Sequence, residues 1–231
     1  MSVLTRMSLN PATRGGRKLL TNRQAMHAAI MAAFSPETHD EMGGRVLWRV
    51  DRDAHRHVLY TVSPVEPDLT HLVEQAGWAG QSWDAVSYDA FLGRLTRGQV
   101  WGFRLAANPV RAVAREGARS KVLPHVTPAQ QVGWLDERSA GWGFSLVGSL
   151  RGGTTEETRK NGVLVSQRHD DRFGRAESVA GRRSKVTLRI AQFDGTLEVT
   201  DAQALRCALV AGMGRAKGYG CGLMTLRPVE G

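Results

Sequence analysis

A histidine in a predicted helix near the start of the chain is the strongest candidate for proton-transfer chemistry. His27 lies in the mostly apolar stretch 25–34, and the basic residues Arg17, Lys18 and Arg23 precede it. An imidazole has a pKa of about 6.5, so it can give or take a proton in neutral solution, and a well-placed one contributes roughly 10²–10⁴-fold in rate. Nearby guanidinium and ammonium groups can stabilise negative charge on a phosphate. Such a histidine is ordinarily just a partly buried helix residue, so the pattern alone leaves both interpretations open.

The sequence predicts no metal site and no cofactor. His55 and His57 lie in a turn with Asp51 and Asp53, and a solvated turn explains this grouping better than a metal site. The His-Asp pair at 39–40 has the same interpretation. The two cysteines lie in a predicted helix and a glycine-rich strand, and they indicate neither a disulfide framework nor a zinc site.

The spacing of apolar residues predicts the same order of elements twice along the chain. The first half predicts a strand over 3–9, a helix from a cap at Thr21 or Asn22 to Ala33, a hairpin of strands 45–50 and 58–62, a helix over 69–76 and a strand over 83–88. The second half begins with a predicted strand over 100–106, a basic loop, a helix opened by Thr127-Pro128 and a strand over 144–150. It continues with a hairpin of strands 185–192 and 196–199 around the turn Phe193-Asp-Gly195, a helix from Asp201 to Val210 and a strand over 223–226. This order predicts an α+β fold of two tandem ferredoxin-like (RRM-like) domains, at 1–94 and 99–231, each an antiparallel sheet with two helices.

Composition indicates a globular protein with a polyanionic partner. Hydrophobic residues make up 42% of the 231 residues, enough for a sizeable core. Lys and Arg outnumber Asp and Glu by 31 to 22, and the sequence pI is about 10.3. Solubility alone can explain a surplus of this kind, but its clustering favours nucleic acid. No signal peptide or membrane-spanning stretch is visible, so we expect a cytoplasmic protein.

The basic residues gather beside the first helix, between 104 and 121, between 151 and 189, and in a glycine-rich loop. Arginine dominates, and its planar fork suits bidentate phosphate contacts and stacking on bases. RNA is favoured over DNA by analogy with other ferredoxin-type sheets. The candidate RNA-binding residues are Arg14, Arg17, Lys18, Arg23, Arg111, Arg115, Arg119, Lys121, Arg159, Lys160, Arg182, Arg183, Arg215 and Lys217.

The glycine-rich loop, residues 212–222, is the most informative stretch. Its glycines are Gly212, Gly214, Gly218, Gly220 and Gly222. It is not a Walker A loop, because it follows a predicted helix and enters a strand. Alternating glycines along a strand would clear one face and let a ribose-phosphate approach, although a tight helix–strand junction explains them equally well. Tyr219 can stack on a base, but we expect it to fill the opposite face of the sheet.

Four stretches of the chain together resemble a known family. The glycine-rich loop and the strand after it, 212–226, look like the C-terminal signature of repeat-associated RNA-binding (RAMP) proteins. The stretches 60–68 (YTVSPVEPD), 103–110 (FRLAANPV) and 193–197 (FDGTL) resemble, more narrowly, the CasE family of CRISPR repeat endoribonucleases from type I-E systems. The resemblance runs nearly end to end in the same order.

This resemblance implies tandem ferredoxin-like domains that grip a CRISPR repeat hairpin, cleave at the 3′ base of its stem and keep the 5′ product bound within the Cascade complex. By the same resemblance, His27 matches the catalytic histidine. Some members carry a tyrosine three residues earlier, where this chain has Gln24. A lysine in the basic hairpin region assists in some members, and Lys185 is the nearest match here.

Residues and resemblance together predict a metal-independent endoribonuclease. RNA supplies its own nucleophile, the 2′-hydroxyl, so the protein needs only proton transfer and charge stabilisation. The products would be a 2′,3′-cyclic phosphate (or a 3′-phosphate) and a 5′-hydroxyl end, with His27 as general base or general acid. The main alternative is a catalytically silent scaffold of the same fold that binds an RNA hairpin. A nucleotide-binding metabolic enzyme lacks a phosphate loop or carboxylate constellation to support it.

Overall fold

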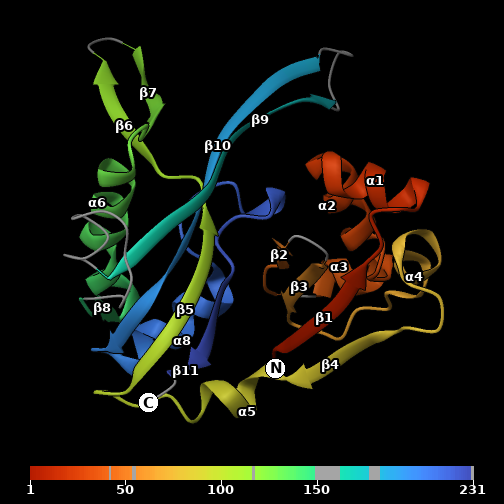
Figure 1. Cartoon of the computed structure of the whole chain (residues 1–231), viewed down its shortest axis with the longest axis horizontal. Helices are drawn as coiled ribbons and strands as arrows, with labels where there is room; N and C mark the ends of the chain where they lie inside the picture. Colours follow the sequence, from red (N-terminus) through yellow and green to blue (C-terminus); the bar gives the residue numbers. More distant parts are fainter. Residues whose placement is uncertain (42, 54–55, 116–117, 149–161, 177–182, 230–231) are drawn as a thin grey trace.

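A computed structural model of the chain describes residues 1–41, 43–53, 56–115, 118–148, 162–176 and 183–229. Side chains are described in these ranges except at 39–41, 115, 118–119, 174–176 and 183–186. The described elements form two units that follow each other along the chain and lie side by side (Figure 1).

The first unit is a four-stranded antiparallel sheet with helices on one face. Its strands are β1 (Val3–Leu9), β2 (Leu47–Arg52), β3 (His57–Ser63) and β4 (Trp83–Ser87), in the order β2-β3-β1-β4. Its helices are α1 (Arg14–Thr21), α2 (Arg23–Met31), α3 (Pro36–Glu41), α4 (Thr70–Ala76) and α5 (Tyr88–Leu92). The helices α1, α2 and α4 pack on one face of the sheet, whereas Tyr88 and Leu92 of α5 belong to the core of the second unit. The helix α1 was not expected, because its composition is polar and basic. The hydroxyl of Thr13 caps it by accepting from the backbone N–H of Gly16 at 2.9 Å, and Leu19 and Leu20 are buried beneath it.

The second unit has the same antiparallel plan, and both units follow the ferredoxin-like element order expected from the sequence. Its elements are β5 (Val100–Ala107), β6 (Val110–Arg115), β7 (Ala118–Pro124), α6 (Pro128–Ser139), the 3₁₀ helix η1 (Ala140–Trp142), β8 (Phe144–Leu146), β9 (Val163–Ala176), β10 (Arg183–Val199), α8 (Ala202–Ala211), the 3₁₀ helix η2 (Lys217–Tyr219) and β11 (Met224–Pro228). The sheet order is β11-β5-β10-β8, and β9 also pairs with β10.

Two expectations for the second unit were wrong. The expected hairpin turn at 193–195 is the interior of one long strand, β10, which pairs with β5 and β9 instead of folding back. Asp194 accepts a hydrogen bond from Arg104 on β5 at 2.5 Å, and a side chain at Gly195 would lie 2.9 Å from the ring of Phe103. In the Asp-Gly pair, Asp194 therefore forms an ion pair and Gly195 allows the close approach of Phe103, and the two residues do not form a turn. The expected basic loop after β5 is the two-stranded hairpin β6–β7.

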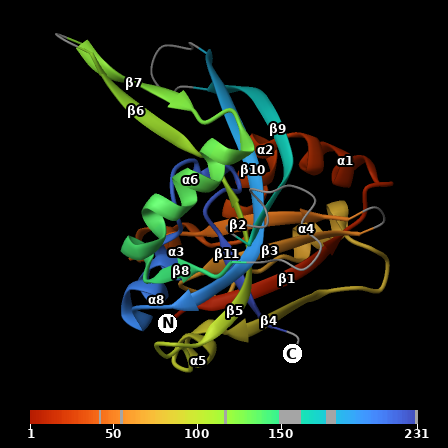
Figure 2. The same cartoon turned by 60° about the vertical axis from the view of Figure 1, so that its left-hand side comes forward.

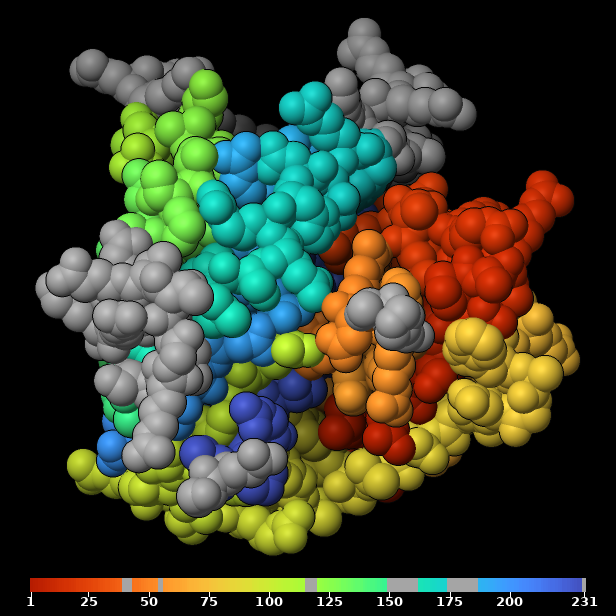
Figure 3. Space-filling model, viewed as in Figure 1, coloured from red at the N-terminus to blue at the C-terminus, as the bar shows by residue number. Residues whose placement is uncertain are grey.

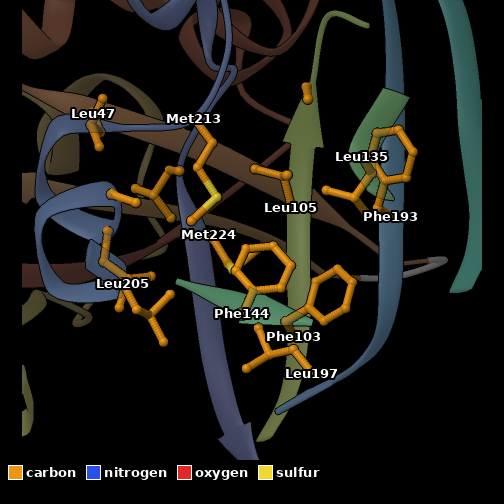
Figure 4. Close-up of a cluster of buried hydrophobic side chains, with 14 of the residues drawn as sticks. Leu47, Phe103, Leu105, Leu135, Phe144, Phe193, Leu197, Leu205, Met213 and Met224 are labelled. Carbon is orange, nitrogen blue, oxygen red and sulfur yellow. The ribbon is translucent and has the colours of Figure 1, made fainter. Parts of the chain in front are cut away.

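Each unit has a hydrophobic core between its sheet and helices. In the first unit, side chains of β1 and β3 such as Met7 and Leu59 pack against Met26 and Ile30 of α2. In the second unit, the largest cluster is built around aromatic and aliphatic residues of β5, β8 and β10, shown with residues of α6, α8 and β11 in Figure 4. Leu47 of β2 belongs to this second cluster, so the two units share part of one core.

The sheet faces opposite the helices meet between the units, and a buried arginine lies there. Arg49 on β2 is only 2% exposed, and its guanidinium donates to the backbone oxygens of Arg104 and Leu223 at 2.7 and 3.0 Å. Its charge is balanced by Asp51, whose carboxylate also binds Arg104 at 3.3 Å. A second contact joins the units where the amide of Gln167 donates to the backbone oxygen of Arg52 at 3.0 Å, and β2 and β9 are neighbours on the surface in Figure 3. These contacts hold both units in one arrangement.

The strands β9 and β10 and the hairpin β6–β7 project beyond the sheet on the same side of the molecule (Figures 1 and 2). The helix α2, which carries His27, lies close to β9 and to η2 of the second unit. The two units thus bring the first helices of the chain next to its glycine-rich loop.

Candidate active site

The helix α2 presents His27 toward the second unit. The side chain of Asn22 begins the helix by accepting from the backbone N–H of Ala25 at 3.0 Å. Met26 and Ile30 are buried and anchor the helix on its sheet, while His27 is only partly buried. The sequence therefore predicted both the helix and the half-buried state of this histidine.

The glycine-rich loop lies directly against the imidazole of His27. A Cβ atom built on Gly218 would lie 3.6 Å from Cε1 of His27, an ordinary van der Waals distance, so the backbone of the loop lies about one methyl group away from the ring. The ring of Tyr219 is also close, with its centroid 6.3 Å from that of His27. The indole N–H of Trp48 on β2 donates to the backbone oxygen of Gly218 at 3.3 Å and fixes the loop in place. Residues almost two hundred positions apart in the sequence thus form one site.

The electrostatic setting of His27 suits proton transfer. Burial lowers the pKa of its imidazole, so the neutral form dominates in neutral solution. Its Nδ1 atom is buried and has no hydrogen-bond partner among the described residues, and Oε1 of Gln24, one turn earlier on α2, is in the same state. Buried polar atoms without partners are rare and need an explanation. Here they mark a place where a polar ligand could complete the hydrogen bonding.

Arg23 links the helix, the loop and the long strand β9. Its guanidinium donates to the backbone oxygen of Tyr219 at 2.8 Å and to the carboxylate of Asp171. A third contact, of 3.2 Å, joins Nη2 of Arg23 to Nε2 of His169. Because Nδ1 of His169 lies 2.8 Å from the backbone oxygen of Gln167 and must donate there, Nε2 accepts from Arg23 in the neutral ring. Arg23 was expected to bind RNA, but in this structure its donors are used inside the protein.

Sequence reasoning missed most of the partners of Arg23. His169 and Asp171 lie in a strand about 145 residues further along the chain, and nothing in the local sequence indicated that they meet α2. Arg52 lies beside them, where burial, and to a smaller extent the charge of Arg23, lowers the pKa of its guanidinium. The one available signal was the mixture of basic and acidic residues at 168–175, which is also typical of a solvated strand.

The glycines of the loop serve turns and close packing rather than a strand. Gly212, Gly214, Gly220 and Gly222 all have positive φ angles, and η2 interrupts the stretch, so the expected alternation along a strand is wrong. At Gly220, φ is +76° and a Cβ would lie 2.5 Å from the ring of Trp48. Tyr219 lies in η2 and not on a strand, but its ring does pack on a sheet, against the cluster that Leu188 and Ile190 of β10 form with Cys221. Its ring lies between His27 and Phe173, whose centroid is 4.7 Å away.

The described basic residues lie on three parts of the surface. Arg14, Arg17 and Lys18 are exposed on α1, and Arg111 and Lys121 are exposed on β6 and β7. In the loop, Arg215 is exposed, whereas Lys217 is half-buried and donates to the backbone oxygen of Ala211 at 2.8 Å. Burial, and then the nearby Arg45, lowers the pKa of Lys217.

The remaining candidates are only partly covered by the structure. Arg159, Lys160 and Arg182 lie outside the described residues. The backbones of Arg115, Arg119, Arg183 and Lys185 lie in the strands β6, β7 and β10, but their side chains are outside the described set. The assisting role of Lys185 therefore stays a prediction.

The described residues show neither a metal-binding cluster nor a membrane-spanning helix. No three His, Cys, Asp or Glu side chains among them converge on a point where a metal ion could bind. No helix in the described part of the chain is both long enough and apolar enough to cross a membrane.

Comparison with known proteins identifies the family. The family model described as "CRISPR associated protein" matches residues 3–228. The CRISPR-associated endoribonuclease Cse3 of Thermus thermophilus is 32% identical over 227 residues, which cover 97% of this chain and 99% of Cse3.

Solved structures agree with this match. The structure of Cse3 bound to a 19-nucleotide RNA has a TM-score of 0.77 at 30% identity, covering 98% of this chain and 99% of that one. The Thermus thermophilus Cse3 bound to an RNA representing a pre-cleavage complex has a TM-score of 0.74 at 28% identity, with coverage of 98% and 99%. Cas6e of Escherichia coli K-12, with a TM-score of 0.59 at 20% identity and coverage of 99% and 100%, shares the fold. The chain therefore belongs to the family of CRISPR-associated proteins that includes the endoribonuclease Cse3.

Proposed function

We propose that this chain is an endoribonuclease that binds the hairpin of a CRISPR repeat RNA and cleaves it with the RNA's own 2′-hydroxyl as nucleophile. The observation that carries the proposal is the position of His27, a half-buried imidazole whose Nδ1 has no hydrogen-bond partner among the described residues, beside the glycine-rich loop of the second unit. Membership of the Cse3 family supports it, because Cse3 is an endoribonuclease and its structures hold RNA.

The proposed reaction needs one proton acceptor and one proton donor. Neutral His27 takes the proton from the 2′-hydroxyl, and the 2′-oxygen forms a bond to the adjacent phosphorus. The bond from phosphorus to the 5′-oxygen then breaks, the leaving oxygen takes a proton from a water molecule, and the imidazolium of His27 returns its proton to the solvent. The products are a 2′,3′-cyclic phosphate and a 5′-hydroxyl end. The lowered pKa of His27 favours the role of general base over that of general acid.

Cationic side chains around the loop would stabilise the charge that develops on the phosphate. Lys217 directly precedes Gly218, the loop residue whose built Cβ would meet His27, and Arg215 lies two residues further back. Their positive charges would act on a phosphate held near the loop. The exposed basic residues of α1 and of the hairpin β6–β7 would hold the stem of the RNA through its phosphates.

The wider setting follows from the family. We propose that residues 1–94 and 99–231 act as its two domains, that the protein works in the cytoplasm, and that it uses no metal ion. The 5′ product would stay bound, and the protein would become a subunit of an RNA-guided surveillance complex of the Cascade type. Co-elution of protein and cleaved hairpin in size-exclusion chromatography tests product retention, and separate elution of the two would contradict it.

Cleavage of the matching repeat RNA in EDTA tests the mechanism. The wild-type protein should cut at one position and leave a cyclic phosphate or 3′-phosphate, whereas His27→Ala should bind the hairpin but lose cleavage by a factor of at least about 10². His71→Gln is a matched control, because its amide can keep the hydrogen bond that His71 makes to the backbone oxygen of Ala29 at 2.8 Å. Full activity of His27→Ala, or loss of wild-type activity on chelation, would refute the mechanism. Tight hairpin binding by the wild type without cleavage between about pH 6 and 9 would favour the silent scaffold.

A further inference from the structure

A pocket lies next to the proposed active site, where three segments of the second unit meet. Its walls come from the end of β5 and the hairpin β6–β7, from the paired strands β9 and β10, and from the glycine-rich loop. Figures 1 and 2 show the hairpin and the paired strands projecting on the same side of the molecule. Its lining includes Asn108, Val110, Val122, Leu188, Arg215 and Tyr219.

Tyr219 is the wall that this pocket shares with the site of His27. Its ring lines the pocket, and the same ring lies 6.3 Å from the imidazole of His27 and 4.7 Å from the ring of Phe173. A group bound in the pocket is therefore a direct neighbour of a group held at His27. On a polynucleotide, such neighbours are consecutive nucleotides.

Two polar groups of the pocket lack protein partners. Asn108 is 7% exposed, and its Oδ1 atom has no hydrogen-bond partner among the described residues. Arg215 is exposed, and its guanidinium makes no hydrogen bond or ion pair within the part of the chain that the structure describes. A backbone β-bridge between Asn108 and Arg215 holds the two residues together. By contrast, Arg189 in the same pocket is neutralised by Asp170, which it binds through two hydrogen bonds of 2.6 and 2.7 Å.

This combination of groups fits a nucleobase. The side chains of Val110, Val122 and Leu188, with the ring of Tyr219, offer apolar surface for the flat faces of a base. The amide of Asn108 and the free guanidinium of Arg215 offer hydrogen bonds for its edge. Asn pairs with the N6 and N7 positions of adenine, and Arg with the O6 and N7 positions of guanine, so both side chains suit a purine.

We propose that this pocket binds the purine base of a nucleotide that flanks the cleaved phosphate, with Asn108 and Arg215 reading its edge. The proposal rests on the proposed function, because it assumes that the cleaved phosphate lies at His27. The pocket then sets which nucleotide stands beside the cut, and it holds the RNA backbone in register with the imidazole.

A binding experiment tests the pocket independently of cleavage. The repeat hairpin is made with a 2′-deoxy nucleotide at the mapped cut, which removes the nucleophile, and with the fluorescent purine analogue 2-aminopurine at one flanking nucleotide or the other. We expect the wild-type protein to quench the analogue at one of the two positions. Arg215→Ala and Tyr219→Leu should lose this quenching, while Arg97→Ala, which removes the same charge from an exposed loop, should retain it. Quenching at neither position, or quenching unaffected by both pocket variants, would overturn the proposal.

A cleavage experiment then tests the role of the base. Replacing the flanking purine by an abasic site should slow single-turnover cleavage by the wild type about tenfold or more, the loss typical of one stacked or bidentately paired base. In Arg215→Ala, the logarithm of the slowing caused by the abasic site should be less than half of its wild-type value. Tyr219→Phe, which keeps the ring, should be slowed by the abasic site as much as the wild type is. The same abasic penalty in Arg215→Ala and wild type would refute the proposal.

The two proposals fail in different ways. If the wild type cuts the hairpin but neither pocket variant changes the response to the flanking base, the pocket proposal is wrong and the endoribonuclease stands. If the 2-aminopurine signal depends on Arg215 but the natural hairpin is never cut, the endoribonuclease is wrong and the pocket stands as a base-binding site.

Discussion

Asp171 on β9 binds the guanidinium of Arg23, which lies one helical turn before His27 on α2. The two side chains are 31% and 17% exposed, so the pair is largely removed from water. Through Nη1, Arg23 also donates a hydrogen bond to the backbone oxygen of Tyr219 in the glycine-rich loop. Through Arg23, the carboxylate is therefore linked both to the glycine-rich loop and to the helix that carries His27.

We expect Asp171→Asn to slow cleavage by roughly 10–10²-fold with little loss of hairpin affinity. The substitution leaves the charge of Arg23 uncompensated in a half-buried place, and a displacement of about 1 Å at a reacting group can cost about 10²-fold. Single-turnover rates and hairpin dissociation constants separate the two effects. Asp84→Asn is the matched control, because Asp84 pairs with Arg6 on the exposed surface. An equal loss of rate in both variants, or a loss of affinity that accounts for the whole effect, would contradict the positioning role.

The pH dependence of cleavage should follow His27 in its neutral form. Burial lowers the pKa of this imidazole below its ordinary value of about 6.5, and only the neutral ring can accept a proton. The logarithm of the single-turnover rate should therefore rise with pH in acid solution. It should stop rising once most of His27 is neutral, at a pH below about 6.5. A circular dichroism spectrum at each pH shows whether the protein stays folded. A rate that falls as the pH rises from about 5 to 7 would instead assign His27 as the general acid.

Much of this site could be predicted from the sequence, because many of its features depend only on residues that are close together in the chain. The cap at Asn22, the apolar spacing of α2 and the glycine-rich loop are each encoded within a few neighbouring residues. What could not be predicted depends on contacts between distant segments. The Asp-Gly pair at 194–195 has the composition of a turn, yet it lies inside β10, because Asp194 finds Arg104 on another strand. The helix α1 was likewise not predicted, because most of its residues are polar and only two leucines, Leu19 and Leu20, pack into the core.

Two glycines of the loop should respond differently to alanine. At Gly220 the positive φ and the ring of Trp48, 2.5 Å from a built Cβ, make any side chain costly, so Gly220→Ala should lower the free energy of unfolding by about 1–3 kcal/mol or more. At Gly218 a Cβ meets only His27, at 3.6 Å, so Gly218→Ala should change it by less than about 1 kcal/mol. Urea denaturation of the two variants measures both values. Equal stability of the pair would contradict the close packing of Trp48 on the loop.

Removing Arg49 should weaken the contact between the two units. Arg49→Ala deprives Asp51 and the backbone oxygens of Arg104 and Leu223 of their donor, and breaking a buried pair in this way costs about 3–5 kcal/mol. The exposed pair of Arg6 and Asp84 gives the comparison, since Arg6→Ala should cost about 0–1 kcal/mol. If Arg49→Ala does not fold, Arg49→Lys, which keeps the charge but loses the fork, should still be less stable than the wild type. Wild-type stability of either Arg49 variant would contradict the role of this interface.

The hairpin β6–β7 should contribute to RNA binding through phosphates. Arg111 and Lys121 are exposed on its two strands, and a variant that no longer binds one of the phosphates should show a slope of log affinity against log salt that is shallower by about one. The double variant Arg111→Ala, Lys121→Ala should therefore bind the repeat hairpin more weakly at low salt, with a slope reduced by roughly two.

The control for the hairpin variant is Arg94→Ala with Arg97→Ala, which removes the same net charge from the exposed turn after α5. Its salt slope should stay close to that of the wild type, because general attraction between net charges is screened and needs no defined contact. Cleavage by the hairpin variant at saturating protein should keep its rate, since neither residue reaches His27. A reduction of the slope by the same amount in both double variants would show that the hairpin acts only through net charge.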